Sequence, residues 1–498
     1  MTKRAPEVLA CEAPSALQLA RKPALSDLLQ RQRSAFLSDG PPSLTQRRAT
    51  LASLRTLVLE FRTRIEGAVS ADFGHRSRHE TALLEVLGVV QAIDYLSNNL
   101  RRFMAPQKRH VATTYRGGSA RVEYQPLGVV GVVAPWNYPF SLLMIPLATA
   151  LAAGNRVMLK PSELTPRTGE LIEEMMRSLF LPTEVEVVRG GPDVGAEFCG
   201  LQFDHLLFTG STQVGRKVMA AASEHLVPVT LELGGKCPVL VARGHAKALA
   251  VERIVFGKLT NAGQTCVAPD YAFVHESEVD AFVELYDQAV RRFYPDGPTG
   301  QDYTSIISDH HYRRICGLIE DARSKGARVL EVGVQPGAAS TRLRTVAPTL
   351  IVDAGEDALA MQEEIFGPVL PVRSYKSLAE VVDYINGRPR PLALYYFGAE
   401  DRDCEQVRRR TTSGNLTVNG TMVHVAIDDL PFGGVGESGM GAYHGIEGFR
   451  AMSHAKGVFV QSRWSLPSLL RAPFGWLAER TIASTLRGRG ASRPRLSV

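Results

Sequence analysis

The sequence of 498 residues predicts an α/β protein with two parallel-sheet units in tandem. Strand-like apolar segments alternate with helical segments between residues 157 and 235, and a second series of this kind runs from about 238 to 430. A charge-free stretch from Tyr124 to Asn155 has the pattern of a buried strand, a turn and an apolar helix. Two such units imply a cleft between them, which is a usual place for a ligand.

The composition is that of an ordinary soluble protein. Apolar residues make up 45% of the chain and charged residues 22%, which excludes a disordered, a collagen-like and a multi-span membrane protein. The six cysteines are too sparse for a disulfide scaffold and form no C-x-x-C pair. Charged residues interrupt the first 25 positions, so no secretory signal is expected there. These features predict a cytoplasmic protein.

The net charge of +6 comes from the C-terminal tail, residues 463–498, which holds seven arginines against one acidic residue, Glu479. The remainder of the chain is neutral, and we therefore expect no nucleic-acid partner. The tail also contains Phe474 and Trp476 among leucines and arginines, with Pro467 and Pro473 interrupting any helix. A peripheral tail is the expected interpretation, and docking on a membrane surface is the alternative.

The N-terminal part is predicted to be mainly helical. Residues 1–45, rich in Ala, Pro, Ser and Leu, are expected to form an extension. A helix is expected next, because apolar residues from Leu51 to Val69 follow one helical face, and a second helix is expected over 79–103. Residues 111–128 alternate around a Gly-Gly turn, which predicts a β-hairpin.

Strands and helices then alternate through both predicted units. The strands expected in the first unit are 157–160, 185–190, 205–211 and 229–235, with a long helix over 165–179. Those expected in the second unit are 238–242, 271–276, 349–352, 369–373 and 393–397, with helices over 246–262 and 278–293.

Two segments in the first unit could bind a nucleotide. Gly210 and Ser211 follow a predicted strand, and Gly215 lies in the first turn of the next helix, where free amide groups and the helix dipole favour an anion. Lys160 offers donors to hydroxyl groups and Glu163 could bind a ribose diol, although Pro-Ser-Glu is also a common helix start.

Three residues have the chemistry of a nucleophilic site. Cys266 lies in a polar turn after an apolar helix, which suits an accessible thiolate nucleophile, although a lone cysteine is also a common buried filler. Glu232 ends an apolar strand, where desolvation would raise its pKa and suit a general base. Asn137 lies in the charge-free stretch and could stabilise an oxyanion. With no H-E-x-x-H motif and no clustered His, we expect no metal.

Seven short motifs together resemble the aldehyde dehydrogenase superfamily over about residues 48–460. They occur in the order PWNYP (135–139), KPSE (160–163), FTGST (208–212), ELGGK (232–236), GQTC (263–266), EIFGP (364–368) and PFGG (431–434). Residues 263–271 are similar to the class 3 branch, and residues 72–81 are similar to bacterial coniferyl aldehyde dehydrogenases within that branch.

This resemblance implies a fold and a set of roles. It implies a Rossmann-type NAD(P)-binding domain over 46–110 and 127–235, an α/β catalytic domain over 236–430, and a small bridging sheet from 111–126 and 455–462 that pairs subunits in a homodimer. Cys266 would attack an aldehyde, Asn137 would hold the oxyanion, and Glu232 would activate the hydrolytic water. The implied cofactor-binding residues are Lys160, Glu163, Gly210, Ser211, Gly215, Glu364 and Phe366.

The implied reaction is oxidation of an aldehyde to its acid, with NAD as cofactor and NADP as the alternative. An aromatic, cinnamyl-type substrate such as coniferaldehyde is expected, and a medium- or long-chain aliphatic aldehyde is the alternative. The N-terminal extension and the basic tail depart from the class 3 pattern, which leaves the choice of substrate open.

Overall fold

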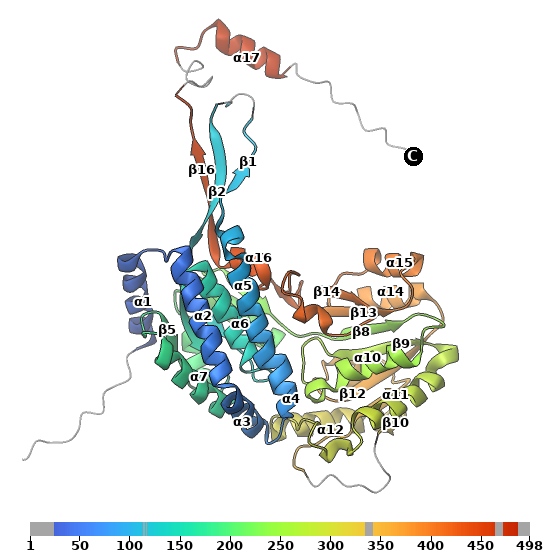
Figure 1. The fold of residues 1–498 in the computed structure, drawn as a ribbon. Helices are drawn as coiled ribbons and strands as arrows, with labels where there is room; N and C mark the ends of the chain where they lie inside the picture. Colours follow the sequence, from blue (N-terminus) through green and yellow to red (C-terminus); the bar gives the residue numbers. More distant parts are fainter. Residues whose placement is uncertain (1–23, 113–114, 116, 334–341, 464–471, 487–498) are drawn as a thin grey trace, which may run out of the picture.

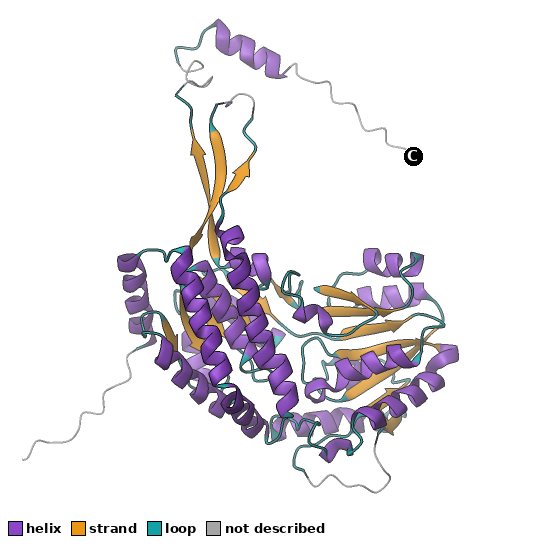
Figure 2. Cartoon of the chain, in the orientation of Figure 1, coloured by secondary structure: helices purple, strands orange, loops and turns teal. Residues whose placement is uncertain are grey.

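The computed structural model describes residues 24–112, 115, 117–333, 342–463 and 472–486. Figure 1 shows two α/β units side by side and a three-stranded sheet that projects away from them. Helices cover the faces of both larger sheets (Figure 2). The α/β class with two parallel-sheet units is therefore confirmed. Within the described part of the chain, no helix combines the length and the apolar character needed to cross a membrane.

The first unit contains a six-stranded sheet in the order β15-β7-β6-β3-β4-β5, parallel except for β15. Its strands are β3 (Val129–Val133), β4 (Arg156–Lys160), β5 (Val185–Val187), β6 (His205–Thr209), β7 (Val229–Glu232) and β15 (Gly439–Met440). All residues of β6 are buried, as expected for a parallel strand covered on both faces. The strand order changes direction between β3 and β6, which is the usual ligand position in such sheets.

The helices of this unit match most of the predicted elements. They are α1 (Leu25–Asp39), α2 (Leu44–Glu60), α3 (Arg62–Phe73), α4 (Arg78–Thr81), η1 (Ala82–Leu87), α5 (Gly88–Met104), α6 (Ser141–Ala153), α7 (Pro166–Leu179), α8 (Pro192–Cys199), α9 (Thr212–Ser223) and α16 (Gly445–Ala451). The single helix predicted over 79–103 is α4, η1 and α5 in continuous succession, with the π-helical stretch η1 between two α-helical ones.

The segment predicted as an N-terminal extension contains helix α1, which packs on this unit next to β3 and β4. The buried amide of Gln32 donates hydrogen bonds to the carbonyl oxygens of Val157 (3.1 Å) and Pro182 (3.0 Å). These bonds, together with buried Leu29, fix α1 to the body of the protein. Residues 1–23 of the predicted extension lie outside the described residues.

The second unit contains a seven-stranded sheet in the order β10-β11-β12-β9-β8-β13-β14, parallel except for β10. Its strands are β8 (Cys237–Val241), β9 (Pro269–His275), β10 (Arg328–Glu331), β11 (Thr349–Val352), β12 (Val369–Tyr375), β13 (Ala393–Phe397) and β14 (Asn415–Val418). Its helices are α10 (Ala248–Leu259), η3 (Thr260–Gly263), η4 (Glu276–Glu278), α11 (Val279–Phe293), η5 (Gly297–Thr299), α12 (Asp309–Ser324), α13 (Leu359–Gln362), α14 (Leu378–Asn386), α15 (Arg402–Arg410) and η6 (Val423–Ala426).

The projecting sheet consists of β1 (Gln107–Arg109), β2 (Ser119–Pro126) and β16 (Ser453–Val460). Strand β16 runs antiparallel to β2 over its whole length, from Ser453 opposite Pro126 to Val460 opposite Ser119. The predicted hairpin is present, but its first strand lies at 107–109, before the predicted start at 111. Of the predicted tail, the structure describes helix α17 (Trp476–Leu486); 464–471 and 487–498 lie outside the described residues.

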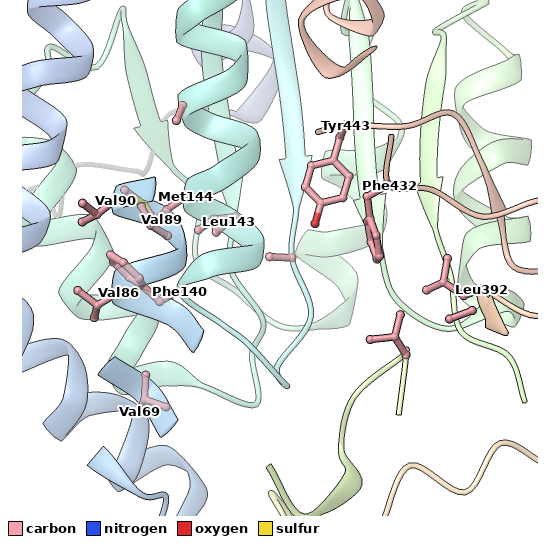
Figure 3. Packing of buried hydrophobic residues seen from close by; sticks show 14 of the residues in the cluster. Val69, Val86, Val89, Val90, Phe140, Leu143, Met144, Leu392, Phe432 and Tyr443 are labelled. Carbon is pink, nitrogen blue, oxygen red and sulfur yellow. The ribbon is translucent and has the colours of Figure 1, made fainter. Parts of the chain in front are cut away.

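A continuous hydrophobic cluster joins the two units. On one side it contains Val86, Val89 and Val90, which point from η1 and α5 toward helix α6 (Figure 3). On the other side it reaches Leu392 and Phe432, beside the second unit. Each fully buried aliphatic or aromatic side chain contributes about 1.5–3 kcal/mol. The shared core therefore holds the edges of the two sheets in a fixed relation.

Candidate active site

Two cavities meet between the units, and Cys266 and Glu232 line both of them. One cavity has a volume of about 240 Å³ and extends toward α5 and η6. The other, of about 250 Å³, lies at the C-terminal ends of β3 and β6 and is also lined by Asn137. The structure thus brings together the three residues predicted for catalysis, at the position where the strand order of the first sheet changes direction.

The turn that carries Cys266 has an unusual backbone. Asn261, Ala262 and Gly263 are consecutive residues with positive φ, of 53°, 49° and 72°. A Cβ atom at Gly263 would lie 2.2 Å from the carbonyl oxygen of Gly367, so only glycine fits there. The buried Gln264 side chain closes the turn, because its amide donates to the carbonyl oxygen of Asn261 (3.0 Å). These constraints hold the following cysteine in one position.

Asn137 is fixed from both sides. Its side-chain amide donates a 3.2 Å hydrogen bond to the carbonyl oxygen of Gln264. Its own carbonyl oxygen accepts hydrogen bonds from Arg76 (3.0 Å) and from the Asn261 side chain (3.0 Å). The Asn137 amide has a second hydrogen, and the residue lines the same cavity as Cys266. The arrangement suits an oxyanion donor beside the sulfur.

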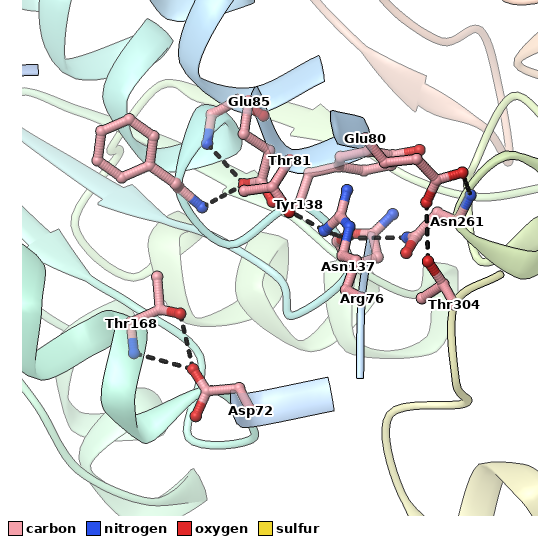
Figure 4. A network of polar contacts seen from close by, with 12 residues as sticks. Asp72, Arg76, Glu80, Thr81, Glu85, Asn137, Tyr138, Thr168, Asn261 and Thr304 are labelled. Carbon is pink, nitrogen blue, oxygen red and sulfur yellow. Dashed lines mark hydrogen bonds and ion pairs between the residues drawn. The ribbon is translucent and has the colours of Figure 1, made fainter. Parts of the chain in front are cut away.

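A buried ion pair supports this loop. The Arg76 guanidinium and the Glu85 carboxylate are 2.7 Å apart, and neither side chain is exposed. Glu85 also accepts hydrogen bonds from the backbone amides of Phe140 (2.7 Å) and Ser141 (3.1 Å) (Figure 4). Sequence reasoning singled out neither residue for this role, although Arg76 lies inside the segment 72–81 that carries the family resemblance.

Two further residues of that segment hold neighbouring elements together (Figure 4). Glu80 accepts hydrogen bonds from the backbone amide of Asn261 (3.0 Å) and from the Thr304 hydroxyl (2.8 Å). Asp72 accepts hydrogen bonds from the backbone amides of Arg167 and Thr168 at the start of α7. The segment therefore links α3 and α4 to the turn that carries the nucleophile and to the start of α7.

The surroundings of Cys266 favour its neutral thiol. Burial, with smaller contributions from the carboxylates of Glu364 and Glu232, raises the pKa of Cys266 to about 12. A thiol is a poor nucleophile in its neutral form. The reaction therefore requires either a group that accepts the thiol proton or a change of environment when ligands bind.

Glu232 ends β7 and lines both cavities. Its residue exposure is 2%, and neither carboxylate oxygen has a hydrogen-bond partner among the described residues. Burial raises the pKa of Glu232 well above its usual value. An unpaired buried carboxyl group is costly for folding, and raised carboxyl pKa values are typical of acid–base catalysts. Both features support the predicted role as base.

The residues predicted to hold the cofactor occupy two places. Gly210, Ser211, Glu364 and Phe366 line the cavity that contains Asn137. Ser211 is the N-cap of α9, where its hydroxyl accepts a hydrogen bond from the Val214 amide. Burial, more than the nearby Asp270 carboxylate, raises the pKa of Glu364 to about 8. These groups surround a space at a helix N-terminus.

The other predicted cofactor residues, Lys160, Glu163 and Gly215, do not line this cavity. Lys160 ends β4, and its ammonium group is 3.8 Å from the carboxylate of Glu163. Gly215 does not line the cavity. A Cβ atom there would lie 2.5 Å from the Leu233 side chain, so Gly215 allows α9 to pack closely on the end of β7. Its contribution to the site is this close packing.

The cavity that extends toward α5 is mainly apolar, and sequence reasoning did not identify its walls. They include Leu83, Leu142, Ile145, Phe256, Val423 and Phe432, which come from η1, α6, α10, η6 and the following loop. Tyr443 and Asp428 add polar groups. No local motif marks these residues, because they are far apart in sequence and meet only through the packing of the two units.

Comparison with known proteins agrees with this geometry. The model of the aldehyde dehydrogenase family matches residues 17–458. A probable coniferyl aldehyde dehydrogenase from Caulobacter vibrioides is 46% identical over 94% of this chain and 98% of its own length. A coniferyl aldehyde dehydrogenase from a Pseudomonas species is 47% identical over 91% of this chain and 94% of its own length.

Among solved structures, the substrate-bound state of Staphylococcus aureus AldH superposes with a TM-score of 0.84 at 35% identity. The match covers 89% of this chain and 96% of that one. The fold, the order of the motifs and the extent of these matches agree, and this chain belongs to the aldehyde dehydrogenase family.

Proposed function

We propose that this enzyme oxidises coniferaldehyde and related cinnamyl-type aldehydes to their carboxylic acids, with NAD as cofactor. The observation that carries the proposal is the apolar cavity of about 240 Å³ that ends at Cys266 and Glu232. An aryl ring with a conjugated aldehyde would bury its flat apolar surface there and present its carbonyl carbon to the sulfur. The Caulobacter and Pseudomonas relatives, which share nearly half of their residues with this chain, carry names with the same substrate.

The residues of the site account for the proposed steps. The Cys266 thiol first loses its proton to solvent water. The resulting thiolate adds to the aldehyde carbon, and the carbonyl oxygen becomes an oxyanion that the Asn137 amide can bind. Loss of a hydride from that carbon leaves a thioester. Glu232 then removes a proton from water, the water oxygen attacks the thioester carbon, and the Cys266 thiolate leaves with release of the acid.

The groups around the cavity on the Asn137 side suit the nicotinamide and the pyrophosphate of a dinucleotide. The N-terminus of α9 offers backbone amides to a pyrophosphate, and Gly210 leaves the approach free of a side chain. When bound, the cofactor accepts the hydride. The residues that would hold it are Gly210, Ser211, Lys160, Glu163, Glu364 and Phe366, with Gly215 fixing the position of α9. NAD is preferred over NADP in this proposal, because the Glu163 carboxylate would repel a 2′-phosphate.

We also propose a cytoplasmic homodimer. The projecting sheet presents a strand, β16, on which Phe459 is 47% exposed and Val460 is 51% exposed, as expected for a surface that pairs with a second subunit.

All five cysteines that the structure describes are free, which suits a reducing compartment.

Absorbance at 340 nm tests the substrate proposal directly. The purified enzyme should reduce NAD with coniferaldehyde more efficiently, by kcat/KM, than with decanal. A higher kcat/KM for decanal would replace the aromatic substrate with an aliphatic one, and the cavity would then hold an alkyl chain.

A further inference from the structure

Asp428 is an acidic residue in the lining of the apolar cavity proposed to hold the substrate. Asp428 lines the same cavity as Cys266 and is half-buried. Its side chain has no hydrogen bond or ion pair with any residue that the structure describes. Burial alone raises the pKa of Asp428 to about 6. Partial burial of an unpaired carboxylate is unfavourable. A ligand that donates a hydrogen bond to this carboxylate would therefore offset its desolvation free energy.

The next residue, Asp429, is also an aspartate, but its carboxylate has partners in the protein. Asp429 accepts a short hydrogen bond from the Tyr95 hydroxyl and lies 3.7 Å from the guanidinium of Arg102. Its side chain is 66% exposed, and it does not line the cavity. Two successive aspartates therefore differ: Asp429 has protein partners, whereas Asp428 lines the cavity and its side chain has no partner among the residues that the structure describes.

The helix beside the cavity has a glycine, Gly88, where a side chain would otherwise occupy part of the cavity. Gly88 lies within the continuous helical run of η1 and α5, with helical φ and ψ of −58° and −44°. A Cβ atom there would have nothing within 4 Å, so the protein itself does not require glycine at this position. Gly88 lines the cavity, while Val86, Val89 and Val90 of the same run point into the core (Figure 3). Glycine inside a helix is unfavourable, and the empty space it leaves belongs to the cavity.

We infer that this cavity selects aryl aldehydes that carry a ring hydroxyl, with the Asp428 carboxylate accepting the hydrogen bond of the phenol and Gly88 leaving space for the substituted ring. This inference rests on the proposed oxidation of aryl aldehydes at Cys266. A phenol is the group that suits both parts of the wall, because its ring is apolar and its hydroxyl is a good donor to a carboxylate. An alkyl aldehyde offers no donor and would leave Asp428 unpaired.

Three substrates separate the contribution of the hydroxyl from that of the ring. Coniferaldehyde carries the 4-hydroxyl, its 4-O-methyl ether lacks the donor, and cinnamaldehyde lacks both ring substituents. With the wild-type enzyme, kcat/KM for coniferaldehyde should exceed that for the methyl ether about tenfold or more, which is the usual range for a hydrogen bond to a charged group. In Asp428→Ala this ratio should fall toward one. In the near-isosteric Asp428→Asn it should fall only part of the way, because the amide oxygen still accepts a hydrogen bond but carries no charge.

Asp429→Ala is the matched control and should keep the wild-type ratio. Retention of that ratio in both Asp428 variants would overturn the inference, as would an equal loss on all three substrates. Either result would leave the oxidation of aryl aldehydes intact if wild-type turnover is observed. Failure of the wild-type enzyme to oxidise any of the three would overturn both the proposed function and this inference. Circular dichroism spectra and melting temperatures equal to those of the wild-type enzyme show that the variants are folded.

Discussion

The Arg76 guanidinium donates a 2.7 Å hydrogen bond to the Glu85 carboxylate, and both side chains are fully buried. Each partner also binds the loop that contains Asn137. Arg76 binds the Asn137 carbonyl oxygen, and Glu85 binds the Phe140 amide. The pair connects the helices before the site to the oxyanion donor, so it should affect both folding and catalysis.

Loss of one partner of this pair should be severe. We expect Arg76→Ala to lower the free energy of unfolding by about 3–5 kcal/mol, because it leaves Glu85 buried without its cation. Chemical denaturation monitored by circular dichroism measures this change. Arg64→Ala is the control: its ion pair with Glu174 lies on the surface, and its loss should change stability little. Equal effects of the two substitutions would show that the buried pair does not support the loop.

The reactivity of Cys266 should depend steeply on pH. Its pKa is raised to about 12, so below that value the thiolate fraction rises about tenfold per pH unit. In the free enzyme, the rate of alkylation of Cys266 by iodoacetamide should keep rising from pH 7 to pH 10. Mass spectrometry of the peptide that contains Cys266 follows this rate separately from the other thiols. A plateau near pH 8 would mean that the free enzyme already holds a thiolate.

Glu232→Gln should separate the two halves of the reaction. The variant lacks the base for hydrolysis, so we expect the steady-state rate to fall about 10²- to 10⁴-fold. Formation of the thioester does not require activation of water, and stopped-flow absorbance at 340 nm should still show an early burst close to one equivalent per site. Loss of the burst together with the steady state would place Glu232 in the first half of the reaction, as the acceptor of the Cys266 proton.

Replacement of Gly88 should increase stability and decrease activity. Gly88→Ala removes a glycine from a helix, which favours folding by about 0.5–1 kcal/mol. Gly88→Leu should also fill the cavity and lower kcat/KM for coniferaldehyde about tenfold, since a misfit of one or two carbons is worth about 1–3 kcal/mol.

Gly67 in α3 provides the comparison for Gly88, because it is exposed and also has nothing within 4 Å of a Cβ position. Gly67→Leu should leave the kinetics unchanged. A Gly88→Leu enzyme with wild-type kcat/KM on coniferaldehyde would show that the ring does not pass beside α5.

The sequence predicted those parts of the protein that depend on local patterns. The strands around Gly210 and Glu232 are continuous apolar segments that end at polar residues, and the structure contains them as β6 and β7. Cys266, Asn137 and Glu232 lie in short motifs, and the fold places them around the same cavities.

The remaining features depend on contacts between distant segments. The docking of α1 depends on hydrogen bonds from Gln32 to backbone carbonyls more than 100 residues away, and no local pattern reveals them. Gly88 and Asp428 are 340 positions apart, and they line one cavity only because the two units pack together. The first strand of the hairpin, β1, lies before the predicted one and pairs with Ala120 to Val122.

The most direct test of the central claim compares wild-type enzyme, Cys266→Ala and Cys316→Ala with coniferaldehyde and NAD at 340 nm. Cys316 is the matched control, because it is also a partly exposed free thiol but lies on α12, outside both cavities. We expect turnover in the wild type and in Cys316→Ala, and none in a folded Cys266→Ala. Equal turnover in all three proteins would contradict a mechanism that proceeds through the Cys266 sulfur.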